Sequence, residues 1–137
     1  MKIAMGQMPV LYGRIEENMT KAGEMINQAA AEGCQLIVLP ECLDLGWANG
    51  QDLHLAEPLP GKLSDRLCQE AHRHHIWIVA GLTEREADQY YNASVLISDQ
   101  GQIKGSHRKI SLVSGVETMY TPGTKLEVFE TPWGKAG

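Results

Sequence analysis

The continuous apolar run Leu36–Leu39, closed by Pro40, is the feature that most restricts the fold of this 137-residue chain. A short run without polar alternation is typical of a strand that is covered on both faces, as in layered α/β folds. Proline ends such a strand because it has no amide hydrogen to donate to a neighbour. Residues 76–80 repeat the apolar pattern, so the sequence predicts a second buried strand there.

Helical patterns separate the predicted strands. From Ile15 the apolar residues recur at helical spacing, Glu16 and Glu17 stand in the first turn, and Gly33 is placed to end the helix. A second helix is predicted with Ser64 as its N-cap. Its inward face is expected to carry Leu67, Cys68 and Ala71.

The later part of the chain predicts antiparallel pairing. Residues 90–97 and 102–107 flank Asp99-Gln100-Gly101, a turn in which glycine supplies a positive φ, so a β-hairpin is expected. A further strand is expected within residues 2–7, and a loop over residues 47–61. With no repeat, low-complexity tract or linker, we expect residues 1–137 to form one α/β unit with a mixed sheet and no internal boundary.

Composition narrows the classes of partner. The net charge is −5 and no basic stripe is present, which argues against nucleic acid and favours a small polar metabolite. The first residues do not resemble a signal peptide, and no apolar run approaches the ~20 residues of a membrane span, so we expect a cytoplasmic protein. Cys34, Cys42 and Cys68 are odd in number and unpatterned in spacing, which predicts reduced thiols without a disulfide or zinc site.

Two charged residues stand where predicted strands end. Glu41 follows Pro40 at the carboxyl end of a buried strand, where open α/β sheets gather their ligand-binding residues, and a carboxylate there can act as a general base. Lys109 follows the second strand of the predicted hairpin, and its ammonium can stabilise an oxyanion. The alternative for both is a solvated loop charge.

Other polar residues carry weaker signals. Glu117, in Ser114-Gly115-Val116-Glu117-Thr118, is by itself an unremarkable loop carboxylate. His72, His74 and His75 suggest a metal site, but adjacent and alternating positions at a helix end diverge around its axis, so an exposed helix end is the better interpretation. No metal is expected.

The order of these motifs resembles the amino-terminal half of the nitrilase superfamily, the carbon-nitrogen hydrolases. The matching segments are "KIAMGQM", "LIVLPE", "IVAGLTER", "YYNASVLISDQGQIKGSHRKISL" and "YTPGTKLEVFETPWGKAG". No single segment is decisive, but "LIVLPE" followed by a hairpin, by "RK-x-S-L" and by "TPG" is far more specific than any one of them. Family members more often have Tyr and His where this chain has His107 and Ser111, so the surroundings of the pocket depart from the family pattern at these two positions.

The resemblance implies a fold and a set of site residues. The fold would be a nitrilase-like αββα sandwich with a mixed sheet, incomplete in this chain. The family's Glu-Lys-Cys triad would place its carboxylate at Glu41 and its ammonium at Lys109, with Glu117 as a second glutamate that positions lysine and substrate. The family cysteine follows a turn like Gly134-Lys135-Ala136-Gly137, so it would lie beyond residue 137. Cys42 is then a chance neighbour of Glu41, directed away from the site if the backbone is extended there.

The resemblance also implies a reaction and partners. We expect hydrolysis of non-peptide carbon-nitrogen bonds in a small-molecule amide or N-carbamoyl substrate, with nitriles as a further class, and no cofactor. A homodimer or larger homo-oligomer is implied by the resemblance alone. The alternative is a non-catalytic or truncated nitrilase-like domain with only a binding or association role. A chain of these 137 residues by itself is expected to be inactive and poorly soluble, because half a sandwich leaves apolar sheet surface uncovered.

Overall fold

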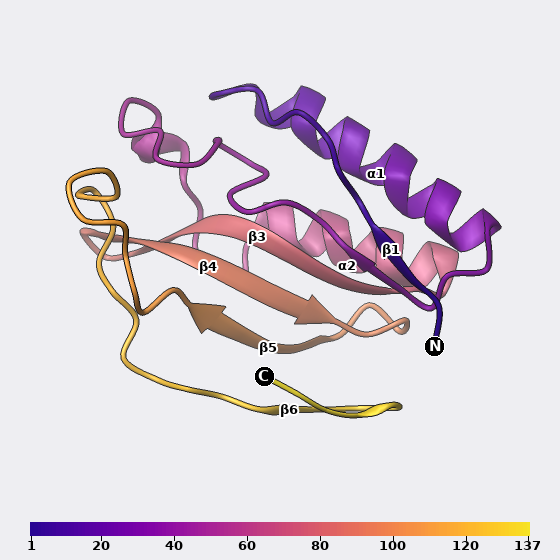
Figure 1. Ribbon diagram of the computed structural model, residues 1–137. Coiled ribbons are helices and arrows are strands. Elements are labelled where there is room, and N and C mark those ends of the chain that lie inside the picture. The colour runs from indigo at the N-terminus through magenta and orange to yellow at the C-terminus, as the bar shows by residue number, and fades with distance from the viewer.

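A five-stranded mixed sheet forms the centre of the computed structural model, which describes residues 1–137 (Figure 1). The strand order is β1-β2-β3-β4-β5, so strands that follow one another in sequence lie side by side. The first three strands are parallel, and β4 and β5 are added antiparallel. The predicted mixed α/β sheet is confirmed. The bounds are β1 Ile3–Met5, β2 Leu36–Val38, β3 Trp77–Glu86, β4 Gln89–Ile97 and β5 Ile103–Arg108.

Two crossover helices make the parallel half of the sheet possible, because parallel neighbours cannot be joined by a tight turn. They are α1 (Ile15–Ala31) and α2 (Lys62–His74). Gly33 ends α1 as predicted: its φ is +73° and its amide donates to the carbonyl of Ala30 at 2.9 Å. Neither α1 nor α2 combines the length and the apolar character that a membrane-spanning helix requires.

The start of α2 differs from the prediction. Ser64 is not the N-cap, because the helix begins at Lys62 with Gly61 before it. Ser64 lies inside the first turn, where its hydroxyl oxygen accepts the Gly61 amide at 2.9 Å. The carboxylate of Glu57 accepts the amide of Leu63 at 3.0 Å and thereby caps a free donor of this turn from outside the helix. Cys68 is half-buried rather than fully inward.

The core lies between the two helices and one face of the sheet. Alternate residues of β3, among them Ile78, Ala80 and Leu82, point toward this layer. The helices contribute Met19, Ala22, Ile26, Ala29, Leu63, Leu67 and Ala71. Every one of these side chains is less than one tenth exposed, so this layer supplies the main hydrophobic stabilisation.

The opposite face of the sheet is covered in part. A hairpin of β6 (Phe129–Thr131) and β7 (Gly134–Ala136) reaches it, with the Trp133 ring 5.6 Å from that of Trp77 and in edge-to-face contact with it. In β2, Val38 is 38% exposed on this face, while its neighbour Ile37 is buried on the other. The expectation that both faces of this strand are buried is therefore met on one face only.

The remaining element boundaries follow the prediction with local changes. The β4–β5 hairpin agrees with the expected one to within a residue at each end. β3 continues to Glu86 instead of ending at residue 80, because its polar second half pairs with β4 along its whole length. The predicted loop over residues 47–61 contains a single 3₁₀ turn, η1 (Leu53–Leu55). The first strand is limited to three residues.

Ile78→Ala is expected to destabilise the protein by about 2–5 kcal/mol, because Ile78 is 0% exposed in the centre of the core and its truncation leaves a cavity. Urea unfolding of both forms measures this difference. Leu126→Ala is the matched control, since Leu126 is 88% exposed and its loss should change the free energy of unfolding by less than about 0.5 kcal/mol. Equal effects of the two substitutions would contradict the assigned core.

Candidate active site

Glu41, Lys109 and Glu117 meet at the end of the sheet, although they come from three separate segments. The Nζ atom of Lys109 lies 3.2 Å from Oε1 of Glu41 and 3.0 Å from Oε1 of Glu117. Glu41 follows Pro40 just beyond β2, Lys109 directly follows β5, and Glu117 lies in the loop after β5. All three residues singled out from the sequence are thus brought together around one ammonium group.

Backbone pairing places Lys109 at this point. Its amide donates to the carbonyl of Asn92 at 2.8 Å, which continues the β4–β5 pairing past the end of β5. The amide of Gly123 in turn donates to the Lys109 carbonyl at 2.9 Å. A side chain at Gly123 would lie 2.2 Å from the carbonyl oxygen of Arg108, so only glycine permits this close approach. The Thr121-Pro122-Gly123 turn therefore helps to fix the segment that carries the lysine.

Glu117 is buried and fully hydrogen-bonded. Its side chain is 0% exposed, and Oε2 accepts the amide of Val113 at 2.7 Å. Oε1 accepts from Trp47 Nε1 at 2.7 Å, from Lys109 Nζ at 3.0 Å and from Asn92 Nδ2 at 3.1 Å. Burial alone would raise the pKa of Glu117, but these donors outweigh it and lower the pKa to about 2. Glu117 is therefore a permanent anion at neutral pH.

Lys109 is held in its charged form by the two carboxylates. Burial lowers its pKa, but the hydrogen bonds to Glu117 and Glu41 outweigh burial, so that the pKa is raised overall. Its side chain is 30% exposed and that of Glu41 is 46% exposed, so both remain accessible from one side. Oε1 of Glu41 accepts from Asn92 Nδ2 at 2.6 Å as well as from Lys109, while Oε2 makes no hydrogen bond within the chain.

Asn92 and Trp47 are the site residues that the sequence reasoning missed. The side-chain amide of Asn92 donates to the carboxylates of both Glu41 and Glu117, and the indole of Trp47 donates to that of Glu117. Asn92 is 5% exposed in the middle of β4, and an amide side chain at a central position of a predicted strand was the signal that could have found it. Trp47 lies in a loop 70 residues from its partner, where no local pattern identifies it.

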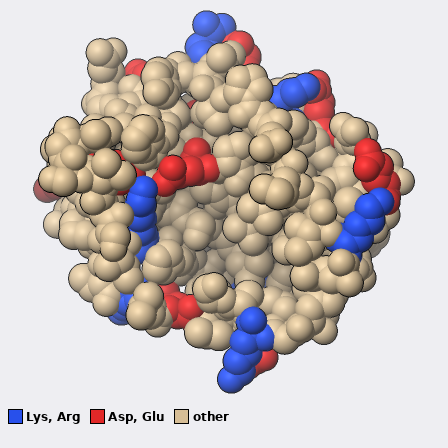
Figure 2. Space-filling view, in the orientation of Figure 1, with Lys and Arg blue, Asp and Glu red and all other residues tan.

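An open cavity of about 500 Å³ lies beside these groups. Its wall contains the apolar side chains of Leu39, Val79 and Ile110 next to Glu41, Asn92 and Lys109. Figure 2 shows the molecule hollowed near the middle of one face, with acidic and basic side chains meeting at the rim. A proton acceptor and a cationic hydrogen-bond donor thus face a space large enough for a small molecule.

Cys42 does not take part in this arrangement. Its thiol is fully buried, with Sγ 3.6 Å from the hydroxyl of Tyr120, and burial raises its pKa to about 12, so it stays protonated at neutral pH. The backbone at Cys42 is left-handed rather than extended, with a φ of +44°, so burial and not strand alternation keeps the thiol away from the cavity. Cys34 is buried in the core, and burial raises the pKa of the half-buried Cys68. All three are free thiols, and none lines the cavity.

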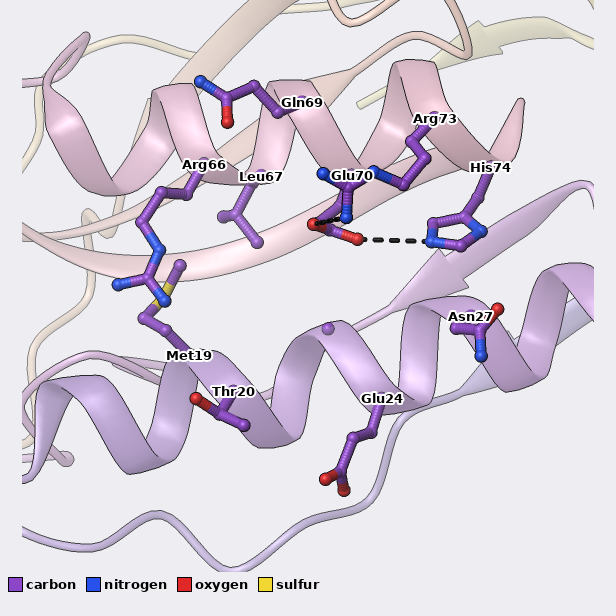
Figure 3. A pocket seen from close by; sticks show the side chains of 11 residues that line it. Met19, Thr20, Glu24, Asn27, Arg66, Leu67, Gln69, Glu70, Arg73 and His74 are labelled. Atoms are coloured by element: carbon purple, nitrogen blue, oxygen red, sulfur yellow. Dashed lines mark hydrogen bonds and ion pairs between the residues drawn. The ribbon is translucent and has the colours of Figure 1, made fainter.

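The histidines at the end of α2 are engaged elsewhere. His74 lies 3.2 Å from Glu70, and the rings of His72 and His75 meet edge to face at 6.0 Å. No group of three or more potential metal-ligating side chains forms anywhere in the chain. A groove of about 510 Å³ lies between α1 and α2. Figure 3 shows its side chains, with Glu70 paired with both His74 and Arg73. Because its charged groups already have partners, we assign this groove no role.

Comparison with known proteins identifies the family. The sequence profile described as carbon-nitrogen hydrolase matches residues 2–137. The chain belongs to the carbon-nitrogen hydrolase family. It is 33% identical over 132 residues to the omega-amidase NIT2 of Xenopus tropicalis, which covers 88% of this chain and 48% of that protein. It is 32% identical over 141 residues to a nitrilase of Pyrococcus abyssi, covering 99% of this chain and 53% of that protein.

Solved structures of this hydrolase family share the fold. Nit3 of Saccharomyces cerevisiae, a member of the nitrilase superfamily, superposes with a TM-score of 0.87 at 26% identity, over 98% of this chain and 53% of that one. An amidase from Nesterenkonia sp. superposes with a TM-score of 0.80 at 20% identity, over 94% of this chain and 51% of that one. The chain therefore spans about half the length of the relatives that it matches.

Glu117→Gln is expected to destabilise the protein by roughly 3 kcal/mol at pH 6, because a pKa lowered from 4.5 to about 2 stabilises the folded state by about 1.4 kcal/mol per unit. A lowered carboxyl pKa contributes stability above the unfolded value, and this contribution disappears as the pH falls from 4.5 toward 2. The difference between the two forms should therefore shrink between pH 6 and pH 3, as measured by urea unfolding.

The control for this experiment is Glu130→Gln, in a carboxylate that is 79% exposed and 3.8 Å from Lys135. We expect no resolved change in stability from it at either pH. A constant difference between wild type and Glu117→Gln across this pH range would contradict the charge assigned to Glu117.

Proposed function

We propose that residues 1–137 are the amino-terminal part of a single carbon-nitrogen hydrolase domain that cleaves amide or N-carbamoyl bonds of small molecules, with nitriles as a further substrate class. The observation that carries this proposal is the Glu41–Lys109–Glu117 cluster beside an open cavity. The third member of the triad is a cysteine beyond residue 137. Membership of the family and the likeness to omega-amidase and amidase relatives support the same reaction class.

The first half of the reaction forms a thioester. Glu41 accepts the proton of the cysteine thiol through its unoccupied Oε2, and the thiolate sulfur attacks the carbonyl carbon. The Lys109 ammonium donates to the oxygen that becomes negative, which stabilises the tetrahedral intermediate. The carbon-nitrogen bond then breaks, and Glu41 returns the proton to the departing nitrogen, which leaves as ammonia or an amine.

The second half releases the acid. Glu41 takes a proton from a water molecule, whose oxygen attacks the thioester carbon. Lys109 again stabilises the oxyanion, the carbon-sulfur bond breaks, and the sulfur recovers its proton from Glu41. Glu117 and Asn92 do not touch the substrate in this scheme. They hold Lys109 and Glu41 in place and keep the lysine charged, so that no metal or organic cofactor is needed.

The chemistry of the cavity favours uncharged substrates of modest size. Two carboxylates surround one ammonium, so the cluster has one net negative charge, and the apolar wall of Leu39, Val79 and Ile110 suits an acyl chain. We also propose a cytoplasmic location and, from the family resemblance, a homodimer or larger homo-oligomer. The alternative, a non-catalytic chain, is favoured by the fact that none of its three cysteines reaches the cavity.

The gene's reading frame beyond Gly137 discriminates between the two proposals. A strand with a cysteine among its first residues supports the hydrolase, whereas a stop codon directly after Gly137 supports the non-catalytic chain. The 137-residue chain alone is expected to release no ammonia from amides in either case.

Glu41→Gln in the natural protein that contains these residues is expected to lower kcat for ammonia release by at least about 10²–10⁴-fold, the range that general acid-base catalysis contributes. Glutamine keeps the size of the side chain and one oxygen acceptor but cannot take up the proton. Glu24→Gln is the control, because Glu24 is an exposed carboxylate of α1 that pairs with Lys21. Near-normal turnover in Glu41→Gln would rule out the general-base assignment.

A further inference from the structure

Asp44 is a buried carboxylate that the proposed mechanism does not use. It is 0% exposed, three residues after Glu41, and burial raises its pKa to about 6. It is therefore ionised at neutral pH, although an ionised carboxylate is costly to bury. Such a group is retained only where hydrogen bonds compensate its desolvation, so its partners indicate what it does.

The partners of Asp44 are on the central strand of the sheet. The amide of Thr83 in β3 donates to both carboxylate oxygens, at 2.9 and 3.1 Å, and the Thr83 hydroxyl donates at 3.3 Å. Thr83 is itself 2% exposed, so its amide has no access to water. Without Asp44 this buried donor would be left without an acceptor, which destabilises the folded state.

The hydrogen bonds next to Thr83 show what Asp44 holds in place. Beyond the end of β2, Leu39 N donates to Val79 O at 2.8 Å, Gly81 N to Pro40 O at 3.1 Å and Leu43 N to Gly81 O at 2.9 Å. The next donor along β3 is Thr83 N, and its acceptor is the Asp44 side chain in place of a backbone carbonyl. The segment 39–44 thus follows β3 as an irregular continuation of β2, and Asp44 forms its last attachment.

Glu41 lies in the middle of this segment, and its backbone packs against Gly81 of β3. A side chain at Gly81 would lie 2.6 Å from the Cα atom of Glu41 and 2.9 Å from the amide of Cys42. The backbone at Cys42 is left-handed, with a φ of +44°, a strained conformation for a residue other than glycine. Such a conformation persists only where attachments on both sides maintain it.

We propose that Asp44 is the positioning residue of the general base: its carboxylate attaches the segment that carries Glu41 to Thr83 and thereby keeps Glu41 against Gly81 and in reach of Lys109. This role rests on the proposed function, in which Glu41 transfers protons. Asn18 of α1 supports the same segment from the other side, since its side-chain amide donates to the Asp44 carbonyl at 3.0 Å.

The thiol of Cys42 provides a reporter that does not depend on catalysis. Cys42 is fully buried within the segment, whereas Cys34 is buried in the core outside it. Labelling of Cys42 therefore reports local opening of the segment, and labelling of Cys34 reports global opening. Peptide mass spectrometry measures both rates in one sample. Asp44→Ala removes the acceptor and the charge, while Asp44→Asn removes the charge and keeps one acceptor oxygen. Comparing the two variants cancels the effect of the Asp44 charge on thiol reactivity.

The expected result is labelling of Cys42 about tenfold faster in Asp44→Ala than in Asp44→Asn, with little difference at Cys34. Ser64→Ala is the matched control, since it removes a buried acceptor from the first turn of α2 and should not favour Cys42 over Cys34. In the active protein, Asp44→Ala should lower kcat with an almost unchanged KM, and Asp44→Asn should recover part of the loss.

Three results would overturn the proposal: equal labelling of Cys42 in the two Asp44 variants, a parallel rise in the labelling rate of Cys34, or selective opening at Cys42 without a loss of kcat.

If Asp44→Ala does not fold, amide hydrogen exchange of Asp44→Asn replaces labelling. The amides of Leu43 and Thr83 are then expected to exchange faster than in the wild type, while the exchange rate of the Ile26 amide stays unchanged. An unchanged exchange rate at Leu43 would contradict the proposal. Absence of amidase activity in the wild type would remove the proposed function, while the labelling result would still decide whether Asp44 holds the segment.

Discussion

The ammonium of Lys109, shared by two carboxylates, is the interaction on which the arrangement of the site depends. Glu117 is 0% exposed, and a carboxylate so deeply buried is stable only when charged and polar donors surround it. Removal of the lysine would leave an uncompensated buried charge, and removal of Glu117 would leave the ammonium with one exposed partner. The three charges therefore stabilise one another and also fix the loop after β5, because Glu117 additionally binds the Val113 amide within it.

The sheet brings these charges together because β3 changes the direction of pairing. On one side β3 is parallel to β2, so the segment after β2 that carries Glu41 lies along it. On the other side β3 is antiparallel to β4, with Asn92 opposite Thr83 in the register. Lys109 follows from the pairing of β4 with β5. Residues 68 positions apart in the chain, Glu41 and Lys109, thus become neighbours through a change in strand direction at β3. From the sequence, antiparallel pairing was expected only for the β4–β5 hairpin.

The parts of the structure that could be predicted from sequence are those that local patterns determine. Apolar periodicity and turn glycines were sufficient for both helices, the mixed sheet and the β4–β5 hairpin, and the ends of predicted strands pointed to Glu41 and Lys109. Glu117 was found only through the family resemblance, because a loop carboxylate has no periodic signal. Asp44, Asn92 and Trp47 were missed since their roles depend on hydrogen bonds across 39 to 70 residues. The start of α2 was misplaced for a different reason: Glu57 lies outside the helix, only a few residues before it, and its side chain supplies the cap that was expected from Ser64.

The two carboxylates beside Lys109 differ in the hydrogen bonds they accept, and this difference supports the separate roles proposed for them. Both oxygens of Glu117 are occupied by donors, and its pKa is lowered to about 2, so it has no tendency to take up a proton at neutral pH. Glu41 uses only Oε1 for Asn92 and Lys109, while Oε2 is free and the side chain is 46% exposed beside the cavity. A proton can therefore be exchanged at Glu41 without breaking the contacts that hold it. Of the two acids, only Glu41 combines access to the cavity with an unoccupied acceptor, and the same donors that make Glu117 a poor base make it a stable support for the lysine.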